Sequence, residues 1–531
     1  MVSLLERLVY HLKSVPNKLA ITGSYGTLTY GQLDDMTERI ARKIRSGGIG
    51  KEDVVTIETD NKYQAIVLLL SVVRAGAAYC MIPNDYPEHR KSLMREKVKS
   101  KLTLRDLEVA EVQMLPENDG LNGELPTARD ENSLLYIIFT SGSTGEPKAV
   151  AIEDRAIWKI VNHNDFYRGQ VIGQFAPLEF DASVYELFGG LLNGMTLRMV
   201  NKDESLDFDV MPDILEEIDT VFLTTRLFNL YVDECLDSFS KLKLVLTGGE
   251  RCSIRHLQEA ARYCKVLNVY GPTETTVYAT KYEVRGDEAV IPIGKLFDKG
   301  KFRIVDEQGR DVEPGNQGEL LISDSGLLRH YLGNEGANAA VFAQHDRIVY
   351  YRTGDIVYEN SDNDLVYVER KDRQVKISGY RIELGEIEEC ARAYGLHKDC
   401  VAHYDGKRLY LYVTDTVELE LLRQYLRSRL PDYMIPTVKV VEQIPMNANG
   451  KTDMNAIKVE QVNDSKNKLI EVIEGVLKSK IVMESTFIEL GGDSIKAMEI
   501  IWKLGGDGYQ LDLDMLFNQT LGEIVEHAKA S

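Results

Sequence analysis

Basic residues are scarce in this sequence relative to acidic ones. Its 531 residues include 63 lysines and arginines against 83 aspartates and glutamates, which leaves a formal net charge of −20. Nucleic acids and anionic membranes bind surfaces with excess positive charge, so neither is an expected partner. Any anionic ligand of this chain would need a local cluster of cations, supplied by side chains or by a metal ion.

Cysteines and long apolar runs are scarce as well. The six cysteines form no Cys-x-x-Cys pair and the nine histidines no His-Glu-x-x-His motif, so no zinc site is expected. Scattered cysteines are typical of proteins in the reducing cytoplasm. The longest apolar run, residues 65–73, is far too short to cross a bilayer, and the first residues lack the pattern of a signal peptide.

Chain length and pattern indicate several domains. A chain of 531 residues is too long for one core, and roughly three or four domains are expected. Strand and helix signals alternate to about residue 285, which predicts an α/β architecture with mostly parallel sheets. Short strands dominate residues 290–370 and predict a small β subdomain. Residues 115–132 are rich in Pro, Asn, Gly and Glu, which is typical of an exposed connector.

The rest of the chain has two smaller parts. Strand and helix signals after residue 371 predict a compact α+β module, and a polar linker follows it. The residues after the linker have helical periodicity, at 469–477, 494–504 and 520–530. We therefore divide the chain into a large N-terminal part, a small α+β part, a linker and a helical end, at 1–371, 372–457, 458–466 and 467–531.

A loop of hydroxyls and glycines follows the apolar run 134–139. Its residues are Thr140, Ser141, Gly142, Ser143, Thr144, Gly145 and, after Pro147, Lys148. Glycines let backbone N–H groups approach an anion, hydroxyls add donors and the lysine adds charge, as a phosphate site requires. It is not a Walker A loop, because Ala149 follows the lysine where that motif has Ser or Thr. On composition alone a surface turn is the commoner interpretation.

The order of the motifs carries more information than any one of them. YIIFTSGSTGEPKAV at 136–150 resembles the phosphate loop of the adenylate-forming superfamily, and further matching motifs are NVYGPTETT, YRTGD, ERKDRQVKISGYRIELGEIE and NANGKTD. Together they resemble a nonribosomal peptide synthetase adenylation domain fused to a peptidyl carrier protein. The resemblance implies an α/β multidomain fold: a layered α/β core with a small β subdomain, a mobile α+β C-terminal subdomain and an all-α carrier bundle.

The resemblance also implies the residues that bind ATP. The nucleotide-binding set would be Asn268, Tyr270, Gly271, Thr273, Asp355 and Arg370. Tyr270 would lie against the adenine, and Asp355 would accept hydrogen bonds from the ribose hydroxyls. Glu274 would hold Mg²⁺, because hard cations prefer carboxylate oxygens. Taken alone, each motif is equally well explained as a turn with a surface carboxylate.

The catalytic set implied by the resemblance is Lys451, Glu274 and Thr140, with Asp372 as the hinge of the small subdomain. A substrate carboxylate would attack the α-phosphorus of ATP while positioned cations stabilise the developing charge. No general base is needed, because a carboxylate is already ionised at neutral pH. Without the motif match, a lysine after Asn-Gly would be interpreted as an exposed turn residue.

The amino acid would be bound at FDAS, residues 180–183. In the amino-acid-activating branch the aspartate pairs with the substrate ammonium, although Asp181 alone could be a helix cap. The pocket positions carried over are Asp181, Ala182, Tyr185, Phe222, Leu246, Gly248, Val269, Val277 and Tyr278. Apart from Asp181 and Lys451, no position of this pocket has a charged side chain, so a substrate with an aliphatic side chain is expected. The set is similar to those for isoleucine, with leucine and valine as alternatives, since one methylene changes binding by about 1–3 kcal/mol.

The motif FIELGGDSIKAMEI at 487–500 places Ser494 at a helix start, where a serine is often only an N-cap. It resembles the carrier motif whose serine bears 4′-phosphopantetheine. This implies a phosphopantetheinyl transferase and a downstream condensation or other synthetase domain as partners. Departures from the family pattern lie at 82–85, Ala149, Ser323 and Glu369, beside the reacting groups. Rival functions are an acyl- or aryl-acid CoA ligase, which would not need Asp181, and a non-catalytic carrier scaffold.

Overall fold

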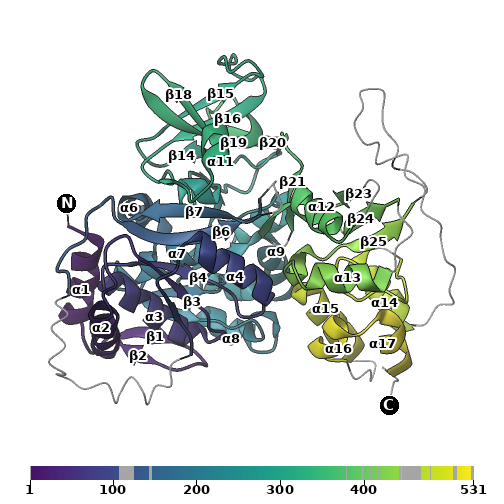
Figure 1. The fold of residues 1–531 in the computed structure, drawn as a ribbon, viewed down its shortest axis with the longest axis horizontal. Helices are drawn as coiled ribbons and strands as arrows, with labels where there is room; N and C mark the ends of the chain where they lie inside the picture. The colour runs from purple at the N-terminus through teal and green to yellow at the C-terminus, as the bar shows by residue number, and fades with distance from the viewer. Residues whose placement is uncertain are drawn as a thin grey trace. The chain divides into compact units, whose positions relative to one another are not determined.

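The computed structural model (Figure 1) describes most of the chain. The described residues are 2–106, 125–142, 146–377, 379–395, 400–406, 408–414, 419–441, 444, 468–478, 480–505 and 511–527. They form two compact units, and the first contains residues 1–84, 93–140 and 148–372. The second contains 85–92, 141–147 and 373–531. No helix in these described ranges is both long and apolar enough to span a bilayer.

Two sheets organise the first unit. The larger has the order β14-β13-β12-β11-β10-β8-β9-β1-β2, and the smaller β17-β7-β6-β4-β3-β5. The strands of the larger sheet are β1 (Leu19–Thr22), β2 (Leu28–Thr29), β8 (Val171–Gln174), β9 (Thr196–Met199), β10 (Thr220–Thr224), β11 (Leu244–Gly248), β12 (Lys265–Tyr270), β13 (Thr280–Glu283) and β14 (Lys295–Leu296). Those of the smaller are β3 (Val54–Ile57), β4 (Ala78–Met81), β5 (Leu102–Leu104), β6 (Leu134–Thr140), β7 (Lys148–Glu153) and β17 (His330–Tyr331). Parallel pairs extend from β12 to β1 in the larger sheet and from β6 to β5 in the smaller sheet, as the alternating pattern predicts.

One continuous apolar core contains side chains from both sheets and from helices α3 and α7. Helix α3 is buried almost throughout, which explains why its sequence shows no polar stripe. Helices α1 and α2 instead begin with capping boxes, Ser3 with Glu6 and Thr29 with Gln32. The helices up to residue 260 are α1 (Leu4–Ser14), α2 (Tyr30–Ser46), α3 (Lys62–Arg74), α4 (Glu88–Lys97), α6 (Asp154–Val161), α7 (Ala182–Leu191), α8 (Met211–Glu216), α9 (Thr225–Glu234) and α10 (Ile254–Ala260).

The predicted β subdomain is an antiparallel sheet with one short helix, α11 (Glu335–Val341). Its strands are β15 (Lys301–Val305), β16 (Gly318–Ser323), β18 (Phe342–His345), β19 (Ile348–Glu359) and β20 (Leu365–Arg370). Across β19 and β20, Asp355 lies opposite Arg370. The sheet therefore brings together two residues of the predicted nucleotide site.

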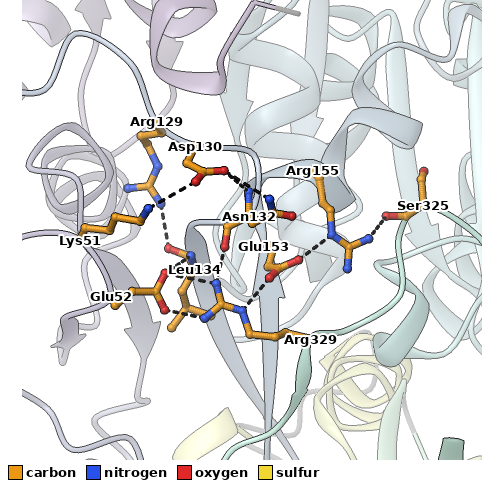
Figure 2. A network of polar contacts seen from close by, with 10 residues as sticks. All are labelled: Lys51, Glu52, Arg129, Asp130, Asn132, Leu134, Glu153, Arg155, Ser325 and Arg329. Atoms are coloured by element: carbon orange, nitrogen blue, oxygen red, sulfur yellow. Dashed lines mark hydrogen bonds and ion pairs between the residues drawn. The ribbon is translucent and has the colours of Figure 1, made fainter. Parts of the chain in front are cut away.

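A polar network fixes the ends of β6 and β7, the strands that flank the glycine-rich loop (Figure 2). Arg329 Nε donates to Glu153 at 2.7 Å, and its other nitrogens contact Glu52. Arg129 donates to the Leu134 carbonyl at 2.7 Å and forms a bidentate pair with Asp154, in which both side chains are 2% exposed. The predicted exposed connector at 115–132 is thus wrong at Arg129, whose ion pair allows its burial; residues 115–124 lie outside the described ranges.

The second unit holds the small α+β subdomain and the helical end of the chain, so the predicted fold class is confirmed. The subdomain consists of β21 (Gln374–Ile377), β22 (Tyr380–Glu383), α12 (Leu384–Ala393), β23 (Cys400–Tyr404), β24 (Leu409–Val413), α13 (Leu419–Arg427) and β25 (Thr437–Val440). The end of the chain, yellow in Figure 1, contains α14 (Lys468–Leu477), α15 (Ser494–Gly505), α16 (Leu513–Asn518) and α17 (Leu521–His527) around a shared apolar core. Helix α16 was not predicted, because six residues are too few to show a period.

Candidate active site

The glycine-rich loop joins the antiparallel strands β6 and β7. Thr140 ends β6 and lies opposite Lys148, the first residue of β7. The Lys148 ammonium lies over the ring of Tyr331, 5.8 Å from its centroid. The predicted site residues Ser143, Thr144, Gly145 and Lys451 lie outside the described residues.

Glu274 lies in a one-turn helix, η4 (Thr273–Thr275), and its side chain is fully buried. The Tyr331 hydroxyl donates to Glu274 Oε1 at 2.6 Å, so one tyrosine contacts both Glu274 and Lys148. The described residues include no group of three or more His, Cys, Asp or Glu that could hold a metal. A carboxylate fits Mg²⁺ here if nucleotide phosphates and water supply the remaining ligands, as is usual for this ion.

Tyr270 and Asp355, 85 residues apart, are joined by a short hydrogen bond from the phenol to Oδ2. Arg370 donates to the other oxygen, Oδ1, at 3.0 Å, and also contacts Asp372 through Nε and Nη2. Burial, and then the charge of Asp355, raise the pKa of Tyr270 well above its usual range, so the phenol remains a donor. The carboxylate predicted to bind ribose is therefore already held by two donors.

The turn after β12 depends on glycine and on strained backbone. A Cβ on Gly271 would lie 2.6 Å from the Val277 carbonyl oxygen, so only glycine allows this close approach. Thr276 and Val277 have φ values of 53° and 66°, which are unfavourable for β-branched residues. Such strain is concentrated at functional sites, and here it positions Val277 and the next residue, Tyr278.

Several of the predicted substrate residues are direct neighbours. Phe222 lies opposite Leu246, and Gly248 lies opposite Val269, on adjacent strands. Tyr185, Val277 and Tyr278 are buried in the apolar core of the first unit, and Ala182 packs against that core. The Tyr278 ring is 5.4 Å from Tyr185 and 5.7 Å from Phe222, measured between centroids. Tyr185 donates its hydroxyl to the Phe166 carbonyl at 2.7 Å. The Tyr278 hydroxyl is buried and has no hydrogen-bond partner among the described residues.

Asp181 stands at the N-cap position of α7, but its side chain makes no capping hydrogen bond. Its carboxylate is half-buried. Burial, then Tyr185 and Glu186, and after them the charge of Asp181 raise the pKa of Tyr278. The helix-cap interpretation of Asp181 is therefore not what the structure shows. An acidic group close to an apolar aromatic cluster is the arrangement that an α-amino acid needs.

Two more residues contribute to the site: Asn268, which was predicted, and Tyr331, which was not. Asn268 donates to the Pro292 carbonyl at 2.7 Å, so its side chain is held by the segment that precedes β14. Tyr331, which contacts both Lys148 and Glu274, was not predicted by the sequence analysis. A buried tyrosine at the end of a short strand carries no local signal for such a role.

Ser494 is the first residue of α15, and its side chain is half-exposed. The preceding residue, Asp493, caps the helix: its Oδ1 accepts a hydrogen bond from the Lys496 N–H at 2.9 Å. The serine hydroxyl therefore lies at the positive end of a helix without serving as its cap. This arrangement fits a phosphodiester, which the helix N-terminus stabilises.

Comparisons with known proteins agree with this arrangement. The AMP-binding enzyme family matches residues 10–332, and the phosphopantetheine attachment site family matches residues 467–528. The chain is 34% identical to bacitracin synthase 1 of Bacillus licheniformis, over 92% of its own length and 10% of that protein. It is 31% identical to surfactin synthase subunit 3 of Bacillus subtilis (strain 168), over 94% of its length and 43% of that protein. The chain thus spans less than half of these relatives.

A solved structure also matches nearly the whole chain. It is that of holo-PA1221, an NRPS protein containing adenylation and PCP domains bound to a vinylsulfonamide inhibitor. The TM-score is 0.82 at 26% identity, and the match covers 98% of this chain and 96% of the other.

Proposed function

This chain belongs to the AMP-binding enzyme family and joins an adenylation domain to a carrier domain with a phosphopantetheine attachment site, and from that premise we propose a two-step reaction. An amino acid carboxylate attacks the α-phosphorus of ATP, and pyrophosphate leaves with the electrons of the broken P–O bond. The aminoacyl group then passes from AMP to the thiol of a phosphopantetheine arm on Ser494, which forms a thioester. We propose nonribosomal peptide synthesis as the process that uses this thioester.

The protein's part in the first step is positioning and electrostatics. Lys148 and the backbone of the glycine-rich loop would stabilise the phosphates, with Lys451 near the reacting carboxylate. Glu274 would hold Mg²⁺, which supplies further positive charge when bound. Asp355 would exchange the Tyr270 phenol for ribose hydroxyls, with Arg370 keeping the carboxylate in place.

The position of Asp181 is the observation that supports an amino acid substrate. Its carboxylate lies at the start of α7, near the aromatic cluster of Tyr185, Phe222 and Tyr278, where it can pair with an α-ammonium. The mostly apolar cluster favours an aliphatic side chain, isoleucine first and then leucine or valine.

One observation favours a second class of substrate side chain. The buried Tyr278 hydroxyl has no hydrogen-bond partner within the described residues. Leaving a buried polar group unpaired costs about 1–3 kcal/mol, and a substrate with a hydroxyl or amide would remove this cost. A polar amino acid is therefore the alternative to isoleucine.

Partners and location follow from the same chemistry. A phosphopantetheinyl transferase must modify Ser494, and a condensation or other synthetase domain must accept the aminoacyl group. We propose the cytoplasm as the location, because the six cysteines are unpaired thiols as expected in a reducing compartment.

A pyrophosphate-exchange screen across all amino acids tests the proposal. Exchange with isoleucine, leucine or valine supports the aliphatic substrate, and exchange with serine, threonine or an amide residue supports the Tyr278 alternative. Exchange only with fatty or aryl acids would identify an acyl- or aryl-acid CoA ligase instead. The absence of exchange with every acid would leave the non-catalytic carrier scaffold.

A further inference from the structure

Within the second unit, the start of the glycine-rich loop is bound to the small subdomain. The Ser141 hydroxyl donates to the Arg381 carbonyl at 2.7 Å and accepts from the Glu383 N–H at 3.0 Å. The Gly142 N–H donates to Glu386 Oε2 at 3.1 Å. Two donors of the predicted phosphate loop are therefore occupied by protein groups.

Glu386 is held from its other side by a cation. Arg90 Nη1 lies 2.7 Å from Glu386 Oε1, and the exposed fractions of the two side chains are 7% and 0%. Arg90 lies over the Tyr86 ring, whose hydroxyl is 3.1 Å from that of Tyr433. The Nε of Arg90 is buried without a hydrogen-bond partner among the described residues, so this guanidinium retains an unused donor.

Arg90 and the Gly142 N–H bind the Glu386 carboxylate from two sides, and together they form an anion-binding site. A backbone N–H of a glycine-rich loop and a buried guanidinium are the donors that also bind phosphate. The same Gly142 N–H cannot bind a nucleotide phosphate and Glu386 at once. Occupation by Glu386 and occupation by the phosphates of ATP are therefore mutually exclusive.

We propose that Glu386 is a positioning residue that takes the place of a phosphate in the loop. Its carboxylate holds the loop and the small subdomain together when the phosphates are absent, and the phosphates displace it when ATP binds. This inference rests on the proposed function. In that reaction, Glu386 would occupy the loop during the second step, after pyrophosphate has left. That state excludes ATP and favours transfer to the carrier.

Glu386→Gln tests the proposal, because it keeps the size of the side chain and removes the charge. Glu388→Gln is the matched control: Glu388 is another buried carboxylate of α12, and it contacts Arg373 and the Ala402 N–H, both at 2.8 Å and both in the small subdomain. Each variant is assayed in the full holo chain, for pyrophosphate exchange at varied ATP and for loading of the carrier.

We expect Glu386→Gln to lower the KM for ATP about tenfold with little change in kcat for exchange, the size expected for one charge-assisted hydrogen bond. Carrier loading should slow by a similar factor. Glu388→Gln should change neither. Equal effects of the two variants, or an unchanged KM for ATP in Glu386→Gln, would overturn the proposal and leave Glu386 with a structural role alone.

Hydrogen exchange on the wild-type chain gives a second test that no folding defect can obscure. Magnesium pyrophosphate at saturation should speed amide exchange at residues 85–92 and at the start of α12, because the displaced Glu386 no longer joins them. Unchanged exchange in both segments overturns the inference. A wild-type chain that exchanges pyrophosphate with no amino acid overturns the proposed function instead, and this measurement separates the two failures.

Discussion

Replacing Asp181 with alanine is the sharpest test of the proposed substrate. The carboxylate is half-buried beside an aromatic cluster, and it makes no capping bond whose loss would unwind α7. Truncating one partner of a desolvated charge pair costs about 2–5 kcal/mol. Since Asp181 is only half-buried, we expect about 2–3 kcal/mol, which is a roughly 30- to 150-fold fall in kcat/KM.

The assay is pyrophosphate exchange with the preferred amino acid and with the same carboxylic acid lacking its amine. The wild-type enzyme should favour the amino acid, and Asp181→Ala should lose most of that preference, because the deaminated acid never used the carboxylate. Asp213→Ala is the control, since Asp213 is an exposed aspartate in the first turn of α8. An unchanged kcat/KM in Asp181→Ala would refute the pairing of this residue with the ammonium.

Three further substitutions test other parts of the structure. Tyr270→Phe removes one donor to buried Asp355, so the unliganded chain should lose about 1.5–3 kcal/mol of stability. Thermal unfolding should show a smaller loss with saturating ATP, because ribose hydroxyls replace the phenol; equal losses would contradict ribose binding by Asp355. Ser494→Ala should gain no mass after treatment with coenzyme A and a phosphopantetheinyl transferase, yet keep pyrophosphate exchange; modification elsewhere would disprove the assignment. Arg129→Met should lower the free energy of the first unfolding transition by about 3–5 kcal/mol, because it leaves the buried Asp154 carboxylate unpaired. Arg39→Met, which breaks a more exposed pair, should cost less than about 1 kcal/mol, and similar losses would show that burial does not decide the difference.

Local patterns in the sequence predicted the elements that depend on local physics. The helices Lys468–Leu477 and Ser494–Gly505 lie where the sequence predicted them, at 469–477 and 494–504, since a strong helical period needs no distant partner. The helix predicted at 520–530 is present as α17, and Thr520 and Glu523 form a capping box at its start, with N–H bonds of 2.8 and 3.4 Å.

Contacts between distant segments could not be predicted in this way. Nothing near Tyr270 indicates that its hydroxyl meets Asp355, because the contact depends on how β12 and β19 are placed. The burial of Arg129 was missed for the same reason, since its partner Asp154 follows another strand. The motif match named Asp355 and Tyr270, but only the structure shows that they are bonded to each other.

At the start of α15, Asp493 caps the helix and the Ser494 hydroxyl does not, and this affects how the carrier can be modified. Because an aspartate secures the helix end, the adjacent hydroxyl can be esterified without unravelling a turn. Chains with and without the prosthetic arm should thus share one conformation and one melting point. If Ser494 carries the arm as proposed, its attachment would need only the transferase and its donor, and no refolding of the carrier.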